Sequence, residues 1–295
     1  MTGGFDTPRE LGSTTTDVLA EATVRLAASG VPSPEYDAAE LLAHVTGTSR
    51  PALRLAGEPT AEQLRAFWAL VVRRAGREPL QHLTGTAAFR HEELTVGPGV
   101  FVPRPETELL AGWAVDRARD LVREGRVPVV ADLCTGSGAI ALSVVHEVPE
   151  AQVHAVELDE GAFGWASRNL AGSGVDLRQG DIATALSDLD GGVDVVVSNP
   201  PYIPMGAYAS VTPEARDHDP AAALWAGEDG LTAIRVVEQV AARLLRPGGR
   251  VGCEHADAQG EVAPAVFAAA GRWAEVRDHP DLAGRPRYLT ARLAR

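Results

Sequence analysis

Apolar residues recur every three or four positions through most of the first 75 residues. This spacing is typical of helices that bury one face. The pattern predicts helices over residues 16–28, 34–45 and 61–75, with a shorter one over 49–55. Thr60 is placed to cap the third of the longer helices. We therefore predict a small N-terminal helical domain over residues 1–85, suited to partner recognition or to core support.

The pattern changes to short extended runs after residue 85. Residues 88–90 and 94–96 are predicted to form two strands. Gly97-Pro98-Gly99 then marks a turn before a further apolar run. We interpret residues 86–104 as a β-hairpin linker.

From residue 105 onward, strand patterns alternate with helix patterns, which indicates an α/β domain with a mostly parallel sheet and helices on both faces. We assign residues 105–295 to this domain. The last two predicted strands lie close together in sequence, so we expect an antiparallel pair at one edge. The predicted strands cover residues 127–133, 152–158, 193–198, 250–254, 275–277 and 288–292, and the predicted helices 138–147, 161–171 and 229–245.

Composition narrows the classes of protein. The chain has 295 residues, and all 27 of its basic residues are arginine, so no lysine is present to act as a phosphate-binding or Schiff-base lysine. The net charge is −13, and residues 104–295 hold 18 arginines against 28 acidic residues, which disfavours binding of nucleic acid. Two cysteines cannot form a four-ligand zinc site, and we expect no metal. With no apolar run long enough to span a membrane and no signal-peptide pattern, we expect a cytoplasmic protein.

The segment Asp132-Leu133-Cys134-Thr135-Gly136-Ser137-Gly138 follows a predicted strand and opens a predicted helix. Glycine at these positions lets a ligand approach the backbone at the N-terminus of the helix. Glu157 lies at the end of the next strand, where a carboxylate can accept hydrogen bonds from ribose hydroxyls. The pattern predicts a nucleoside-cofactor site, and a dinucleotide remains possible at this point.

A second motif distinguishes between these cofactors. Asn199-Pro200-Pro201-Tyr202 follows directly on a valine-rich strand. Proline has no backbone N–H, so the carbonyls of this loop are free to accept from a ligand. An asparagine carbonyl and a tyrosine ring beside them suit a planar NH2 group, for which a nicotinamide dehydrogenase has no evident need.

Together the two motifs resemble class I S-adenosylmethionine methyltransferases that act on a planar nitrogen. The linker narrows the resemblance: residues 79–85, Phe89 and the run from Phe101 to Glu108 are similar to the HemK/PrmC family. Such a resemblance implies a Rossmann-like, mostly parallel seven-stranded sheet. It also implies methyl transfer from S-adenosylmethionine to the side-chain amide nitrogen of the glutamine in the Gly-Gly-Gln motif of class 1 peptide-chain release factors, and hence a role in translation termination. Residues 1–85 would then recognise the substrate, and residues 105–295 would bind the cofactor and carry out catalysis.

The resemblance also assigns roles to single residues. Glu157 would bind the ribose of the cofactor, and Asp181 and Ile182 would flank its adenine. Asn199 would touch both cofactor and substrate. The methionine part of the cofactor would be wrapped by Cys134, Thr135, Gly136, Ser137 and Gly138; the substrate glutamine would be held by Asn199, Pro200, Pro201 and Tyr202; and Phe101, Arg104 and Glu106 would line the site from the linker.

Two departures from the family pattern stand out: Cys134 replaces a glycine, and His218-Asp219-Pro220 replaces an aromatic residue, glutamate and proline. The second leaves the roles of His218 and Asp219 open. Three alternatives also stay open. One is an adenine-N6 or guanine-N2 methyltransferase acting on nucleic acid. Another is a non-catalytic adaptor, and the third is a mechanism in which His218 or His255 acts as a base.

Overall fold

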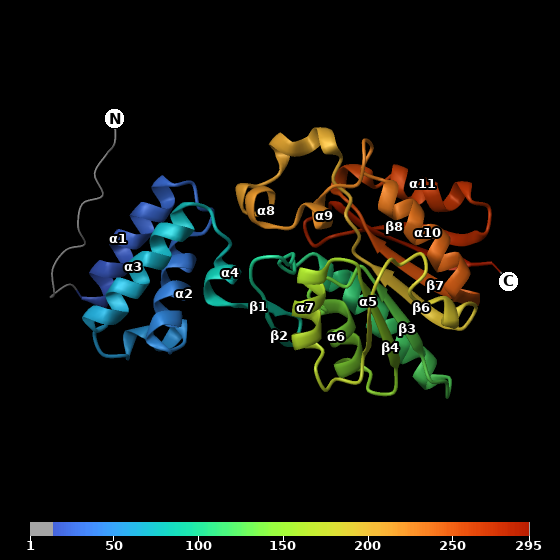
Figure 1. Ribbon diagram of the computed structural model, residues 1–295, viewed down its shortest axis with the longest axis horizontal. Coiled ribbons are helices and arrows are strands. Elements are labelled where there is room, and N and C mark those ends of the chain that lie inside the picture. Colours follow the sequence, from blue (N-terminus) through green and yellow to red (C-terminus); the bar gives the residue numbers. More distant parts are fainter. Residues whose placement is uncertain (1–13, 295) are drawn as a thin grey trace. The chain divides into compact units, whose positions relative to one another are not determined.

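The computed structural model describes residues 14–294, and the chain divides into two compact units, residues 1–85 and 86–295 (Figure 1). None of the described helices is long and apolar enough to cross a membrane.

The first unit is helical, as predicted. Its helices are α1 (Thr15–Ala28), α2 (Pro34–Thr46), α3 (Ala61–Ala75) and the short α4 (Leu80–Thr84), with a 3-10 turn, η1 (Arg50–Arg54). Thr60 caps α3 through a reciprocal pair of hydrogen bonds with Gln63, which explains why the helix begins where the sequence indicates. Its core is a cluster of buried aliphatic side chains around Phe67.

The second unit begins with an antiparallel hairpin of β1 (Thr86–Phe89) and β2 (Glu92–Thr95). A seven-stranded sheet follows, in the order β5-β4-β3-β6-β7-β9-β8. All neighbours are parallel except β7 with β9 and β9 with β8, so the predicted antiparallel pair at the edge is confirmed. The strands are β3 (Val129–Leu133), β4 (Gln152–Glu157), β5 (Asp176–Gln179), β6 (Val193–Ser198), β7 (Leu245–Glu254), β8 (Trp273–Pro280) and β9 (Pro286–Leu293).

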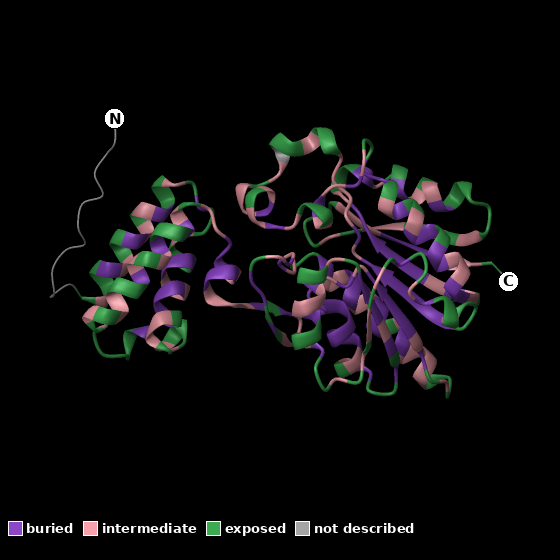
Figure 2. Ribbon diagram, viewed as in Figure 1, coloured by how far each residue is buried: buried purple, intermediate pink, exposed green. Residues whose placement is uncertain are grey.

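Helices cover both faces of the sheet, and the central strands are buried (Figure 2). Successive residues of a strand point to opposite faces. Val195 and Val197 accordingly join the core that includes residues of α5 (Thr107–Arg123), α6 (Ala139–Glu147) and α7 (Glu160–Asn169). Val196 joins the core that includes residues of α10 (Thr232–Leu244) and α11 (Val262–Ala269).

Six α-helices and strands were not predicted from the sequence: α5, β5, α11 and the short helices α4, α8 (Pro213–His218) and α9 (Ala221–Leu224). Strand β5 carries Asp176, Arg178 and Gln179 and has no fully buried residue, so its composition lacks the apolar signal of a strand. Strand β7 also begins earlier than predicted, because the turn at Pro247-Gly248-Gly249 is a bulge within the strand.

Helix α5 packs against β7 at a glycine. A Cβ atom placed on Gly252 would lie 2.6 Å from the Trp113 ring and 2.8 Å from the Leu110 side chain, both on α5. A residue with a side chain would therefore push the helix away from the sheet.

We predict that Gly252→Ala lowers the free energy of unfolding by roughly 1–3 kcal/mol, the cost of overpacking a filled core. Gly164→Ala is the matched control, since Gly164 lies in α7 and a methyl group added there would meet nothing within 4 Å. This control should raise stability by about 0.5–1 kcal/mol. Urea denaturation measures both, and equal stability of the two variants would contradict the close packing of α5 on β7.

Candidate active site

The register of the sheet places three predicted site residues and Glu254 in one row. Leu133 of β3 pairs with Val156 of β4 and with Ser198 of β6, and Ser198 pairs with Cys253 of β7. The next residue of each strand therefore stands at the same carboxyl edge. These residues are Cys134, Glu157, Asn199 and Glu254.

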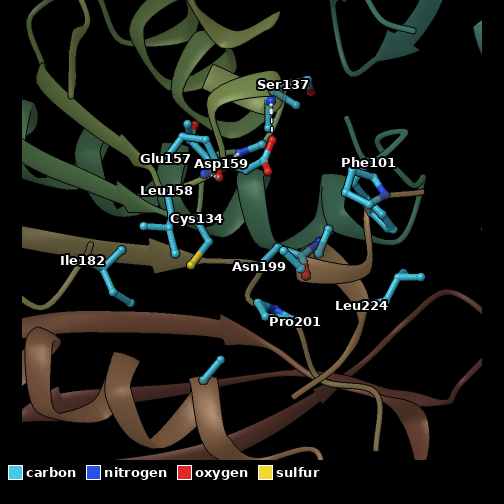
Figure 3. A pocket seen from close by; sticks show the side chains of 18 of the residues that line it. Phe101, Cys134, Ser137, Glu157, Leu158, Asp159, Ile182, Asn199, Pro201 and Leu224 are labelled. Carbon is cyan, nitrogen blue, oxygen red and sulfur yellow. Dashed lines mark hydrogen bonds between the residues drawn. The ribbon is translucent and has the colours of Figure 1, made fainter. Parts of the chain in front are cut away.

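A cavity of about 510 Å³ opens at this edge. In Figure 3, Leu158, Ile182 and Cys134 lie toward one end, and Phe101 and Leu224 toward the other, with Asn199 and Pro201 between the two ends. The predicted site residues that line the cavity are Phe101, Cys134, Thr135, Gly136, Ser137, Glu157, Asp181, Ile182, Asn199, Pro201 and Tyr202.

The loop after β3 turns through backbone conformations that favour glycine. Gly136 and Gly138 have φ of 58° and 86°, and a side chain on Gly138 would meet Leu170 at 2.9 Å. Cys134 has φ of 62°, a left-handed conformation uncommon for residues other than glycine. The cysteine thus adopts the conformation of the glycine it replaces, and the loop keeps its tight turn.

Asp132 stabilises the loop after β3 by accepting hydrogen bonds. Its Oδ2 accepts from the Thr135 hydroxyl at 2.6 Å and from the Ala141 N–H at 3.1 Å, while its Oδ1 is buried with no described donor. Only 1% of Asp132 is exposed, and burial raises its pKa to about 7.

Glu157 joins the loop after β3 to the start of α7. One carboxylate oxygen accepts from the Gly136 N–H at 2.8 Å, and the other from the Asp159 N–H at 2.9 Å. Burial raises its pKa, and these backbone donors oppose the shift. A carboxylate offers about four acceptor sites, so capacity remains for the hydroxyls of a ribose.

The loop after β6 holds two acceptors that have no described donor. Asn199 donates from Nδ2 to the Thr107 hydroxyl at 3.1 Å, and no described residue donates to its Oδ1 or to the Pro200 carbonyl. The Tyr202 hydroxyl donates to Glu254 Oε1 at 3.2 Å, and its backbone carbonyl accepts from Gln259. Both ends of the tyrosine are therefore held in place.

Four predicted site residues do not line the cavity: Arg104, Glu106, Gly138 and Pro200. The roles that the resemblance gives to Arg104 and Glu106 stay predictions. Arg104 instead donates to Asp219 at 2.7 Å and lies over the Phe101 ring. Asp219, whose pKa burial raises to about 6, thereby ties the segment before α5 to Pro220, which lines the cavity.

Neither histidine considered as a base lines the cavity. His255 is fully buried, with Nδ1 2.9 Å from the Ala256 carbonyl and Nε2 2.9 Å from Asp278. Both ring nitrogens are therefore occupied. Within residues 14–294, no three histidine, cysteine or acidic side chains gather as metal ligands.

Two residues to which the sequence assigned no role, Thr107 and Glu254, contact Asn199 and Tyr202 respectively. Thr107 lies in the run from Phe101 to Glu108 that resembles the HemK/PrmC family, so this motif already pointed to it. Glu254 could be found only from the pairing of β6 with β7. Leu158 and Asp159, which line the cavity beside Glu157, were also missed.

Known proteins match both units of the chain. A model described as PrmC N-terminal domain matches residues 17–85, and one described as methyltransferase small domain matches residues 118–212. A release factor glutamine methyltransferase of Streptomyces coelicolor is 58% identical over 94% of this chain and 97% of its own. The chain belongs to the release factor glutamine methyltransferase family. A second relative of that name, from Mycolicibacterium smegmatis, is 48% identical over 93% of this chain and 96% of its own.

A relative with another name is the 4-amino-L-phenylalanine/4-methylamino-L-phenylalanine methyltransferase of Streptomyces pristinaespiralis. It is 46% identical over 72% of this chain and 73% of its own. Among solved structures, the hMettl16 catalytic domain in complex with an RNA hairpin aligns with a TM-score of 0.50 and 16% identity, over 68% of this chain and 75% of that one. This likeness supports the fold alone, and the predicted class I methyltransferase fold is confirmed.

The methyl donor of the enzyme is S-adenosylmethionine, and the cavity suits it. The apolar end at Leu158 and Ile182 can take a flat base, Glu157 has acceptors for ribose hydroxyls, and the Gly136 turn lets the chain pass close to the ligand.

We predict that stability falls as pH rises through the pKa of Asp132. An unfolded aspartate has a pKa of about 3.9, so between that value and about 7 the native state holds a proton that the unfolded state has released. The contribution of Asp132 to the free energy of unfolding should therefore be largest below pH ~4 and decline toward pH 7. In Asp132→Asn this decline should be shallower, as measured by urea denaturation at several pH values.

The control for this prediction is Glu228→Gln, which removes an exposed acid and should leave the slope of stability against pH as in the wild type. An unchanged slope in Asp132→Asn would contradict the buried, protonated state of Asp132.

We predict that Glu157→Ala weakens S-adenosylmethionine binding by about tenfold or more, a difference of about 1.4 kcal/mol. The variant loses acceptors for the ribose and also frees the Gly136 N–H. Glu157→Gln keeps one acceptor oxygen and should fall between alanine and the wild type. Isothermal calorimetry measures the affinities, and wild-type affinity in both variants would remove Glu157 from the cofactor site.

Proposed function

We propose that this enzyme methylates the side-chain amide nitrogen of the glutamine in the Gly-Gly-Gln motif of class 1 peptide-chain release factors. The observation that carries the proposal is Asn199 Oδ1 at the end of β6, an acceptor on a residue that lines the cavity and to which no described residue donates. The neighbouring Pro200 carbonyl also has no described donor; Pro200 does not line the cavity, and we propose its carbonyl as the second acceptor. An NH2 group has two hydrogens to give, and two open acceptors match it. The near-full-length relatives named release factor glutamine methyltransferase support the choice of a protein substrate.

An amide nitrogen is a weak nucleophile because its lone pair is delocalised into the carbonyl. Bound S-adenosylmethionine supplies a methyl group on a positively charged sulfur. Asn199 Oδ1 and the Pro200 carbonyl hold the NH2 hydrogens and so fix the direction in which the nitrogen faces. Placing reacting atoms in this way is worth roughly 7–11 kcal/mol in favourable cases. Acceptors aimed at the nitrogen also stabilise the positive charge that develops on it, and the extra proton then leaves to water.

The segments around the motif shape the rest of the proposed acceptor site. Tyr202 offers its ring to the flat amide, and its hydroxyl is held by Glu254. Phe101 and Leu224, at the end of the cavity beyond Asn199, would contact the residues next to the glutamine (Figure 3). Cys134 to Gly138, Asp181 and Ile182 would contact the cofactor.

We further propose a division of labour along the chain. Residues 1–85 recognise the release factor, residues 86–104 link the two parts, and residues 105–295 bind the cofactor and carry out catalysis. The match of residues 17–85 to the PrmC N-terminal domain supports the first role. The enzyme would act in the cytoplasm on protein, without direct contact to nucleic acid; the net charge of −13 supports the latter point.

Methyl transfer from labelled S-adenosylmethionine tests the proposal, with purified release factor, 4-aminophenylalanine, RNA and DNA as separate acceptors. Label should enter the release factor, and mass spectrometry should place it on the glutamine of the Gly-Gly-Gln peptide. Label in the aromatic amine alone would favour the activity named for the Streptomyces pristinaespiralis relative. Label in nucleic acid alone would favour the amino-group alternative.

We predict that Asn199→Ala lowers the single-turnover rate by at least about 100-fold, the loss typical of removing one polar group that stabilises a transition state. Affinity for S-adenosylmethionine should stay within about tenfold, because the contact matters most as the nitrogen changes shape. Rapid-quench assays and calorimetry measure the two quantities. Retention of the wild-type rate would contradict the acceptor role, and a complete loss of cofactor binding would make Asn199 mainly a cofactor ligand.

A further inference from the structure

Gln259 is a buried amide that contacts three separate loops of the second unit. It ends the short 3-10 turn η4 (Asp257–Gln259) after β7, and 5% of it is exposed. Its Nε2 donates to the Tyr202 carbonyl at 3.1 Å and to the Gly230 carbonyl at 3.2 Å, and its Oε1 accepts from the Ala256 N–H at 3.0 Å. Both amide hydrogens and the amide oxygen are therefore in use.

The three partners allow only one orientation of the Gln259 amide. A carbonyl can only accept a hydrogen bond, and the Ala256 N–H can only donate one. If the amide turned over, its oxygen would face two carbonyl oxygens and its NH2 group would face an N–H. An ionised glutamate of the same shape has no N–H to donate and could not hold the two carbonyls. These contacts are thus specific to an amide.

A glycine at position 230 makes this junction possible. Gly230 has φ of 72°, and a Cβ atom placed on it would lie 2.5 Å from the Tyr202 carbonyl oxygen and 2.8 Å from Gln259 Nε2. A side chain at this position would therefore push the Tyr202 carbonyl or the Gln259 amide away. The junction of Tyr202, Gly230 and Gln259 is packed with no spare room.

The junction joins two segments that line the cavity. Tyr202 ends the motif after β6 and lines the cavity itself, and Gly230 comes shortly before α10, whose residue Ala233 also lines it. Gln259 does not line the cavity, so it can act only through the residues that it holds. Glu254 holds the hydroxyl of Tyr202, whereas Gln259 holds its main chain.

We propose that Gln259 is a positioning residue that, by holding the Tyr202 carbonyl, fixes the Asn-Pro-Pro-Tyr loop in the position that methyl transfer requires. Asn199 and Tyr202 are separated only by two prolines, whose rings fix φ and stiffen the loop. A shift of the Tyr202 carbonyl is therefore passed on to Asn199. The inference rests on the proposed function, because it takes this loop as the place where the methyl acceptor binds.

Two variants test the amide of Gln259. Gln259→Glu keeps the shape and replaces the NH2 group by an oxygen, whereas Gln259→Met keeps the length and removes every polar atom. Both should lower the single-turnover rate of methyl transfer to the release factor by about tenfold or more, since a displacement of about 1 Å near reacting atoms has effects of this size. Affinity for S-adenosylmethionine, measured by calorimetry, should stay within about threefold of wild type, a difference below about 1 kcal/mol.

The control is Gln239→Glu, the same change at an exposed position of α10, which should leave the rate as in the wild type. A wild-type rate in Gln259→Glu would overturn the proposal. A loss of cofactor affinity as large as the loss of rate would also overturn it, because general disruption of the domain would explain both.

A second pair of variants disturbs the junction from the other side. Gly230→Ala places a methyl group against the Tyr202 carbonyl, whereas Gly191→Ala adds one at a φ of 69° with nothing within 4 Å. Both variants carry the strain of a left-handed alanine, but only the first crowds Tyr202. The single-turnover rate should be about tenfold or more lower in Gly230→Ala than in Gly191→Ala. Equal rates in the two variants would overturn the proposal.

Hydrogen exchange tests the positioning role without a methyl acceptor. The chain beyond Tyr202 is held by bonds from the Ile203 N–H to the Leu224 carbonyl and from the Ala226 N–H to the Ile203 carbonyl, each 2.9 Å. In Gln259→Glu these two amides should exchange about tenfold faster than in the wild type, because local opening becomes easier, while the amides of β4 exchange as before.

Unchanged exchange at Ile203 and Ala226 would overturn the role of Gln259 whatever the methyl acceptor proves to be. Faster exchange at these amides, together with a wild-type enzyme that transfers no label to the release factor, would support the hold on the loop and contradict the proposed function alone.

Discussion

The parallel pairing of β4, β3, β6 and β7 is the constraint on which the site depends. Each strand ends at the same edge, so the residue after the last paired position of each contributes one group. Cys134 begins the turn after β3 and Glu157 holds that turn; in the proposed site, Glu157 faces the ribose and Asn199 the methyl acceptor. Glu254, one strand further, accepts from the Tyr202 hydroxyl. A slip of one residue in any pair would turn that strand's side chains to the opposite faces.

The carboxyl edge of the sheet places hydrogen-bond acceptors at the proposed substrate site. In the loop after β6, no described residue donates to Asn199 Oδ1 or to the Pro200 carbonyl, and Pro200 has no N–H that would compete for an acceptor. The buried carboxylates behind the loops, Asp132 and Glu254, have raised pKa values because they are desolvated. They hold backbone and hydroxyl groups in place and do not touch the cavity. The proposed mechanism therefore relies on fixed orientation, without a residue that must exchange a proton with the substrate.

The sequence predicted the first unit, the parallel core and both motifs, because helix caps, valine-rich strands and glycine turns are local signals. It missed β5, whose Asp176 and Arg178 give no apolar pattern at the sheet edge. Nor could it show that the Arg104 side chain contacts Asp219, 115 positions away, because that contact exists only in the folded chain. Glu254 was beyond reach for the same reason: its contact with Tyr202 exists only once β7 pairs with β6.

The most direct test of the central claim changes the atom that the acceptors bind. A release factor in which the Gly-Gly-Gln glutamine is replaced by glutamate presents a carboxylate of the same shape, with oxygens that repel Asn199 Oδ1 and the Pro200 carbonyl. Single-turnover methyl transfer should be readily measured with the glutamine form and absent with the glutamate form, with both substrates saturating. Comparable transfer to the glutamate side chain would contradict recognition of an NH2 group by paired acceptors.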